Sequence, residues 1–139
     1  MAEHLLNHIG GGRFAAFSAG NAPTAVNPLA IEVLTEMGVH AEHAVSKPVV
    51  FFEAEQFDFV INICDSSSAS CEGRRDGCPV LQGQESKGCW GFESSAVLSC
   101  DREATLLHLR KVRDQMTSRL RIWMPAVDKK TRVGKTEAA

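Results

Sequence analysis

Five cysteines are the residues of this sequence best suited to chemistry, and four of them follow one another closely. Cys64 ends an apolar run, and Cys71, Cys78 and Cys89 follow in or beside a stretch rich in Ser, Gly and Arg. A single thiol near the end of an apolar run is often only a small buried side chain. Further thiols on a following loop favour disulfide chemistry, because a flexible loop lets a second sulfur swing in.

Zinc binding is the competing chemistry for the same thiols. Four thiolates can make a tetrahedral site, but structural zinc usually takes its ligands in pairs two to four residues apart. None of the intervals between Cys64, Cys71, Cys78 and Cys89 is that short. We therefore favour disulfide chemistry, and expect neither a bound metal nor a cofactor.

Three other features resemble sites only in composition. The histidines lack a motif such as His-Glu-x-x-His, so we expect them to face solvent; they are His4, His8, His40, His43 and His108. The glycines at 10–12 follow a helix, and the carboxyl end of a helix repels anions, which argues against a phosphate loop. A basic run near the carboxyl end is typical of a solvated helix face; it comprises Arg110, Lys111, Arg113, Arg119 and Arg121.

Composition limits the class of protein further. A chain of 139 residues suits one compact domain, and a net charge of −2 argues against a general nucleic-acid binder. No apolar stretch approaches the ~20 residues needed to cross a bilayer. Free thiols suit a reducing compartment. We expect a cytoplasmic protein without nucleic-acid or membrane partners.

The element that must position Cys64 is a strand over Phe57–Cys64. Its residues are aromatic or β-branched in most positions, which is typical of a buried strand. Helices alternating with strands predict parallel pairing, and parallel sheets carry their chemistry at the carboxyl ends of the strands. Cys64, the last residue of this strand, is therefore expected on the functional edge.

Four elements are predicted before that strand. A helix over Met1–Ile9 is ended by glycine, and the chain starts inside the helical pattern. A short strand should follow it. Asn27 and Pro28 are a cap and a first helical residue, and Ser46 and Pro48 repeat the signal. The three later elements are a strand at Arg13–Ala19, a helix at Asn27–Gly38 and a short helix at Ser46–Glu55.

The second half is predicted as loop, strand, helix and tail. Asp65–Gly88 is expected to be loop, with a short strand over Lys87–Phe92. A long helix should run over Asp101–Met124 and end at Pro125. Its inner face should carry Leu109, Val112, Met116, Leu120 and Trp123. This division gives a domain at 1–125 and a basic, disordered tail at 126–139.

Five groups of short segments, in order over roughly residues 1–124, carry a resemblance to a known family. They are Met1-Ala2-Glu3 with glycines 10–12, Arg13-Phe14 and Ser18-Ala19-Gly20; Asn27-Pro28-Leu29-Ala30 with Glu36-Met37-Gly38-Val39; Ser46-Lys47 with Phe57–Ile61 and Cys64-Asp65; Cys78-Pro79-Val80; and Trp90-Gly91-Phe92-Glu93. Together they resemble the thioredoxin-coupled arsenate reductases, which have the low-molecular-weight tyrosine phosphatase fold. The resemblance implies an α/β three-layer sandwich with a short parallel sheet.

The resemblance also implies roles for the thiols. In that family a loop of the form Cys-x5-Arg holds arsenate while its cysteine attacks. A second cysteine, matched by Cys64, then displaces arsenite, and a third resolves the disulfide. Cys71 keeps the usual spacing for the third and Cys78 keeps its Cys-Pro context; we favour Cys78. The implied partner is thioredoxin or a similar thiol reductant.

Two departures from the family bear on activity. No cysteine of this sequence is followed six residues later by arginine, so the nucleophile loop and the first, central strand before it are missing. Ser94-Ser95 also stands where the family has Asp-Pro, and serine is no comparable general acid. We therefore expect a chain that is inactive as written and that binds arsenate only if the missing loop is supplied.

Several explanations remain open for these departures. A start assigned at an internal methionine would truncate an active enzyme. A genuinely degenerate gene would leave a non-catalytic binding or regulatory protein, and the remaining thiols would also suit a redox or metal-binding module. A missing central strand would leave unpaired strand edges, so we expect low stability and self-association through them.

Overall fold

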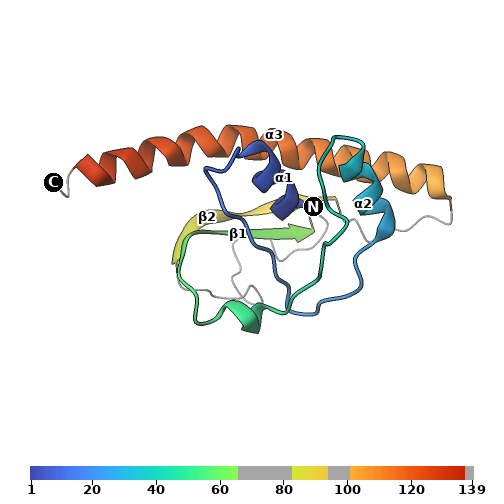
Figure 1. The fold of residues 1–139 in the computed structure, drawn as a ribbon, viewed down its shortest axis with the longest axis horizontal. Helices are drawn as coiled ribbons and strands as arrows, with labels where there is room; N and C mark the ends of the chain where they lie inside the picture. Colours follow the sequence, from blue (N-terminus) through green and yellow to red (C-terminus); the bar gives the residue numbers. More distant parts are fainter. Residues whose placement is uncertain (66–82, 94–100, 137–139) are drawn as a thin grey trace.

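The computed structural model describes residues 1–65, 83–93 and 101–136, and it shows a mixed α/β fold. The elements, in chain order, are α1 (Ala2–Ile9), α2 (Pro28–Thr35), a 3-10 helix η1 (Val49–Phe52), β1 (Phe57–Asp65), β2 (Gly83–Phe92) and α3 (Arg102–Thr136). Figure 1 shows α3 lying across the molecule, with α1 and α2 against it and the two strands beyond them.

The sheet consists of β1 and β2 in the described residues, and the two strands are parallel. The predicted strand over Phe57–Cys64 is confirmed and extends by one residue. The predicted strand over Lys87–Phe92 is also confirmed, but it begins earlier, at Gly83. Residues 83–88 were expected to be loop because their composition is polar; pairing with β1 makes them strand. Residues 66–82 of the same predicted loop lie outside the described residues.

The strand predicted over Arg13–Ala19 is wrong, because this segment forms no ladder within the described residues. Its one bridge lies just beyond it, between Gly20 and Pro48. Ala16 instead finds partners in a side chain: its N–H donates to Asn7 Oδ1 at 2.8 Å, and its carbonyl accepts from Asn7 Nδ2 at 3.0 Å. A strand needs a neighbouring backbone, whereas these bonds hold only one residue of the segment.

Two helix predictions in the first half have different outcomes. Asn27 caps α2 as predicted, since its side chain accepts the N–H of Leu29 at 3.0 Å. The helix ends at Thr35, and the turn after it places Gly38 at φ +72°, a conformation that favours glycine. The helix predicted to run to Glu55 is only the four residues of η1. Its valines and phenylalanines are poor helix formers.

Helix α3 begins as predicted but does not end at Pro125. Asp101 caps it by accepting the N–H of Glu103 at 3.0 Å, and the helix then continues through Pro125 to Thr136. An internal proline costs about 3 kcal/mol. Burial of Met124 and Val127 beside it contributes about 1.5–3 kcal/mol each, which offsets that cost. The predicted tail is therefore helical as far as Thr136, and the domain boundary at residue 125 stays a prediction.

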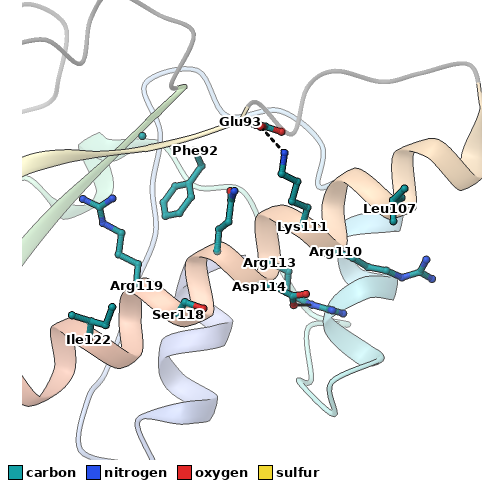
Figure 2. Close-up of a pocket in the computed structure, with 12 residues that line it drawn as sticks. Phe92, Glu93, Leu107, Arg110, Lys111, Arg113, Asp114, Ser118, Arg119 and Ile122 are labelled. Carbon is teal, nitrogen blue, oxygen red and sulfur yellow. Dashed lines mark hydrogen bonds and ion pairs between the residues drawn. The ribbon is translucent and has the colours of Figure 1, made fainter.

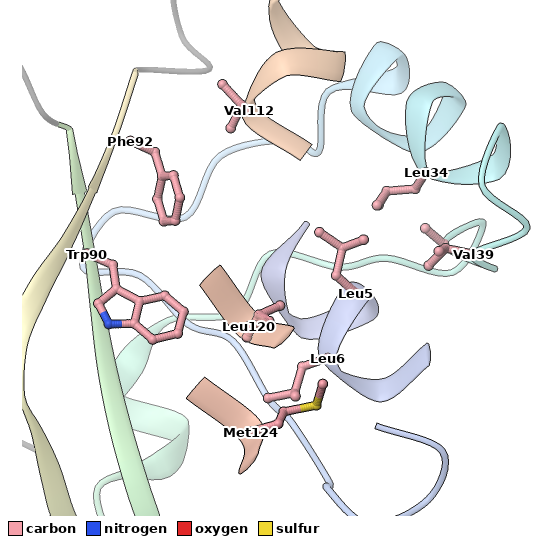
Figure 3. Packing of buried hydrophobic residues seen from close by; sticks show 10 residues of the cluster. Leu5, Leu6, Leu34, Val39, Trp90, Phe92, Val112, Leu120 and Met124 are labelled. Atoms are coloured by element: carbon pink, nitrogen blue, oxygen red, sulfur yellow. The ribbon is translucent and has the colours of Figure 1, made fainter. Parts of the chain in front are cut away.

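The core lies between α3 and the elements packed on it, as Figure 3 shows. Leu5 of α1, Leu34 of α2 and Phe92 of β2 converge there. The predicted inner face of α3 is confirmed, since Leu109, Val112 and Leu120 are buried and the other two predicted residues, Met116 and Trp123, pack against the same core. The three-layer arrangement with a missing central strand stays a prediction.

Candidate functional site

Cys64 lies near the carboxyl end of β1, directly opposite Gly91 of β2. Because the strands are parallel, their carboxyl ends meet at one edge, where α/β proteins bind their ligands. Cys64 is partly buried and takes part in a disulfide bond. The predicted position of this thiol is thus found, and it lies in an oxidised pair.

The partner sulfur of Cys64 lies outside the side chains that the structure describes. Cys71, Cys78 and Cys100 fall outside the described residues, and Cys89 is described only by its backbone, which pairs with Asn62 in the sheet. The choice between Cys78 and Cys71 therefore stays a prediction, as do the catalytic roles of all three.

A charged cluster joins three of the segments that carried the family resemblance. Ser18 donates its hydroxyl to the carboxylate of Glu3, and Lys47 Nζ lies 3.4 Å from that carboxylate. The Glu3 side chain is only 15% exposed. Desolvation alone raises the pKa of Glu3, but the Ser18 hydrogen bond and the Lys47 charge outweigh it and hold the pKa below its ordinary value. Sequence reasoning noted these residues separately and missed that they meet.

A second charged cluster lies at the end of β2. Glu93 accepts a hydrogen bond from Lys111 at 2.7 Å, and a ring nitrogen of His108 lies 3.6 Å from the same carboxylate. The Lys111 hydrogen bond lowers the pKa of Glu93. The carboxylate is therefore ionised at neutral pH. An ionised carboxylate cannot donate a proton, so Glu93 is a poor replacement for the general acid that is absent at Ser94-Ser95.

The basic run on α3 is divided among different partners. Arg110 pairs with Glu36 at 2.6 Å, and Arg113 bonds both Glu36 and the carbonyl of Val33. Arg113 is only 11% exposed, so the expectation of a solvated face is wrong for it. Arg119 lies over the ring of Trp90, 5.1 Å from its centroid.

Metal binding by the histidines finds no support in the described part of the chain. No group of three or more His, Cys, Asp or Glu side chains suited to a metal occurs among the residues it covers. The zinc alternative for the cysteines concerns side chains outside that part and stays open. None of the helices in the described ranges combines the length and apolar character needed to span a bilayer.

A broad open groove runs between α3 and the end of β2, as Figure 2 shows. Its volume is about 1300 Å³. Gly91, Phe92 and Glu93 form one wall, and the outward side of α3 forms the other. Gly91 is the register partner of Cys64. The groove therefore begins about one strand spacing, ~4.8 Å, from the Cys64 backbone. Because side chains alternate along a strand and Trp90 and Phe92 face α3, the Cys64 side chain points to the other face of the sheet.

Comparisons with known proteins agree with this architecture, although no family model matches. The chain is 31% identical over 96 residues to arsenate reductase 1 of Staphylococcus epidermidis, covering 69% of this chain and 67% of that protein. It is 34% identical over 64 residues to a glutaredoxin arsenate reductase of Synechocystis, a match that covers 46% of this chain and 49% of that protein.

A solved structure supports the same assignment. An arsenate reductase in its reduced state superposes with a TM-score of 0.64 at 25% sequence identity, covering 91% of this chain and 86% of the other. The fold and the sequence thus agree on one class of protein, the α/β proteins related to arsenate reductases. The chain belongs to the arsenate reductase family.

Proposed function

We propose that this chain carries the disulfide relay of an arsenate reductase, with Cys64 as its central thiol. The observation that supports this is the disulfide-bonded Cys64 at the carboxyl edge of the sheet in a member of that family. Cys78, or less favourably Cys71, is the proposed resolving cysteine. The substrate is arsenate and the product arsenite.

The relay requires two sulfur exchanges that balance in atoms and electrons. The Cys64 thiolate attacks the sulfur of a cysteine–arsenic adduct; an S–S bond forms, the S–As bond breaks, and arsenite leaves with the electron pair. The resolving thiolate then attacks Cys64 and releases the first cysteine as a thiolate, which takes up a proton. The Cys64 disulfide is the oxidised product of this second exchange.

The cysteine that attacks arsenate must come from a Cys-x5-Arg loop, and residues 1–139 contain none. We propose that the loop belongs on a first strand beside β1, facing Arg13–Ala19. The two segments that would flank this strand both contact Trp123. The ring centroids of Phe14 and Phe59 lie 5.7 and 5.4 Å from that of Trp123. A polypeptide of residues 1–139 alone should therefore reduce no arsenate.

A protein dithiol is the proposed source of electrons, either thioredoxin or a glutaredoxin-like protein. The name of the Synechocystis relative supports this class of partner, since it includes glutaredoxin. The thiol chemistry itself requires a two-electron reductant. Because such reductants keep a compartment reducing, the cytoplasm remains our expectation for where the protein acts.

Disulfide mapping tests the proposal directly. After mild oxidation, peptide analysis should find Cys64 joined to Cys78 or Cys71, and a thioredoxin or glutaredoxin system should open that bond. A Cys64 that stays free while Cys89 pairs with Cys100 would overturn the relay. Arsenate-dependent NADPH consumption above background by residues 1–139, lost in Cys64→Ser, would overturn the missing-loop statement alone.

A thiol-based redox sensor is the second candidate, because a reversible Cys64 disulfide needs no arsenic. Its support is the same disulfide in a sequence that has no Cys-x5-Arg. Supplying the family's first strand and loop as an N-terminal extension separates the two. Arsenate reduction by the extended chain favours the relay; none, with a disulfide that still cycles, favours the sensor.

A further inference from the structure

The groove between α3 and the end of β2 offers an exposed surface beside the thiol edge. Two large apolar side chains, Leu107 and Ile122, are 69% and 77% exposed. With 15 positions between them at 1.5 Å per residue, they stand about 22 Å apart along α3. Both side chains line the groove, so a protein that fills it would cover their apolar surface.

The charges in the groove differ in sign from the chain as a whole. Four cations and two carboxylates line it, whereas the chain carries a net charge of −2. Arg110 and Arg113 are held by Glu36 at the far side of α3. Lys111 is 55% exposed and bonded to Glu93, so its ammonium also faces water.

Arg119 is the cation best placed to meet a partner. Within the described ranges it has no carboxylate partner, and its guanidinium rests on Trp90, which itself is buried. Stacking leaves the N–H donors at the rim of the guanidinium plane free to bond a carboxylate. Figure 2 shows Arg119 extending from α3 toward the strands, with Lys111 nearer the amino end of the same helix.

The spacing along α3 puts these groups in one row. Leu107, Lys111, Ser118 and Ile122 follow at intervals of four, seven and four residues, and all four line the groove. Such intervals keep side chains on one helix face. The row offers apolar, cationic, polar and apolar contacts in turn, and Arg119 adds a second cation beside Ser118.

We propose that this groove is the docking surface for the protein thiol reductant of Cys64, and that Lys111 and Arg119 bind carboxylates on that protein. The proposal rests on the proposed function, which supplies the reductant. The partner chemistry is a protein surface that carries carboxylates between apolar side chains. A partner docked here reaches the carboxyl edge of the sheet, and it must extend around Gly91 to contact the Cys64 sulfur on the other face.

The redox step that follows docking balances. A thiolate of the reductant attacks one sulfur of the Cys64 disulfide, so that a mixed S–S bond forms while the original one breaks. The released thiolate takes up a proton. The second thiolate of the reductant then attacks the reductant's own sulfur in the mixed disulfide. This step releases the remaining sulfur of this chain as a thiolate. Two electrons pass, and the reductant leaves as a disulfide.

The test compares a protein reductant with a small one on the oxidised chain. The rate at which Cys64 becomes alkylatable is measured with a thioredoxin system, with a glutaredoxin–glutathione system and with dithiothreitol. We expect Arg119→Glu and Lys111→Glu each to slow the preferred protein reductant by about tenfold at low salt, because like charges oppose docking. Dithiothreitol rates should stay within about twofold, since that reagent needs no docking surface.

A matched control carries the same change of charge outside the groove. Arg121 lies on the same helix, is exposed and does not line the groove. Arg121→Glu should therefore leave all three rates nearly unchanged. Leu107→Ser with Ile122→Ser removes the apolar contacts while keeping every charge, and should also slow only the protein reductant. Thermal unfolding of each variant verifies that it is folded.

The outcomes distinguish failure of the docking surface from failure of the proposed disulfide relay. If a protein reductant opens the disulfide but the groove variants react as fast as Arg121→Glu, the docking surface is wrong and the relay stands. If neither protein reductant opens the Cys64 disulfide, the docking surface and the relay are both wrong. If the groove variants instead change the sedimentation coefficient, the groove binds a second copy of the chain, which also overturns the proposal.

Discussion

The two flanks of this molecule differ in how completely their polar and apolar groups are satisfied. Where α2 meets α3, Leu109, Val33 and Leu106 are almost fully buried, and Glu36 and Glu32 bind arginines of the facing helix. Where the segment after α1 meets η1, Phe17 is 60% and Phe51 69% exposed. Helices complete their own backbone bonds, but an isolated extended segment depends on a neighbouring strand.

The rings of the second flank contact one another rather than the core. Phe17, Phe52 and Phe57 form three pairs, with centroids 5.9–6.3 Å apart. They lie near the amino end of β1, away from Cys64. The difference teaches that the buried contacts between α2 and α3 contribute most of the stability on these two flanks, whereas the aromatic flank leaves large rings exposed.

The largest expected effect is a core truncation on the α2–α3 flank. Leu109→Ala removes a side chain that is 0% exposed and packs with Val33 and Leu106. We expect the free energy of unfolding to fall by about 2–5 kcal/mol, from lost transfer energy and a residual cavity. Urea unfolding at neutral pH measures it. Phe51→Ser on the aromatic flank should change the same quantity by under about 0.5 kcal/mol.

The same contrast explains what the sequence could predict. The inner face of α3, the Asn27 cap and the strand that ends near Cys64 follow from local periodicity and capping, and all three are observed. The strand over Arg13–Ala19 was not observed, since its existence depends on a partner that no local pattern encodes. Pro125 was misjudged because burial of Met124 and Val127 outweighs a local rule.

The candidate site was predictable to a similar degree. The place of Cys64 follows from the end of an apolar strand, but the meeting of Glu3, Ser18 and Lys47 does not, since 44 residues separate its outermost members. Nor does any spacing show that Arg119 stacks on Trp90. Long-range pairs of polar side chains carry no periodicity, so only the folded chain reveals them.

The second prediction concerns the charged cluster that ties α1 to the aromatic flank. Lys47→Met leaves the mostly buried Glu3 carboxylate without its cation, so the free energy of unfolding should fall by about 1–3 kcal/mol at pH 7. The pKa of Glu3 should rise in the variant, because the Lys47 charge helps to hold it down. Chemical denaturation across a pH series measures both effects.

The sign of the pH dependence follows from the lowered pKa of Glu3. The folded chain binds this proton more weakly than the unfolded chain, so the contribution is full above the unfolded pKa of about 4.3 and is lost as pH falls through the folded pKa. The gap between parent and Lys47→Met should therefore narrow below about pH 4. If the difference in free energy of unfolding between the two chains stays constant down to pH 3, the Lys47 charge does not affect the ionisation of Glu3.

The third prediction tests the aromatic flank as a surface for association. Phe17→Ser with Phe51→Ser removes two of the most exposed rings, so self-association should weaken while the unfolding midpoint shifts little. Sedimentation velocity over a range of protein concentrations measures the association. Leu107→Ser with Ile122→Ser, two exposed apolar residues on α3, is the matched control. Equal effects from both pairs would mean that general apolar exposure, rather than this flank, drives association.

The smallest expected effect is on the ion pairs between α2 and α3. Glu36 binds Arg110 and Arg113, and the Arg110 hydrogen bond is the largest cause of its lowered pKa. Because solvent screens these charges, Glu36→Gln should lower the unfolding midpoint by less than Lys47→Met does. The difference from the parent should shrink further at about 1 M salt, where the Debye length is about 3 Å. Glu53→Gln, a carboxylate without an ion pair in the described residues, controls for the change in net charge. A salt-independent loss larger than that of Lys47→Met would show that the Arg113 bonds to Glu36 and Val33 act as one buried unit.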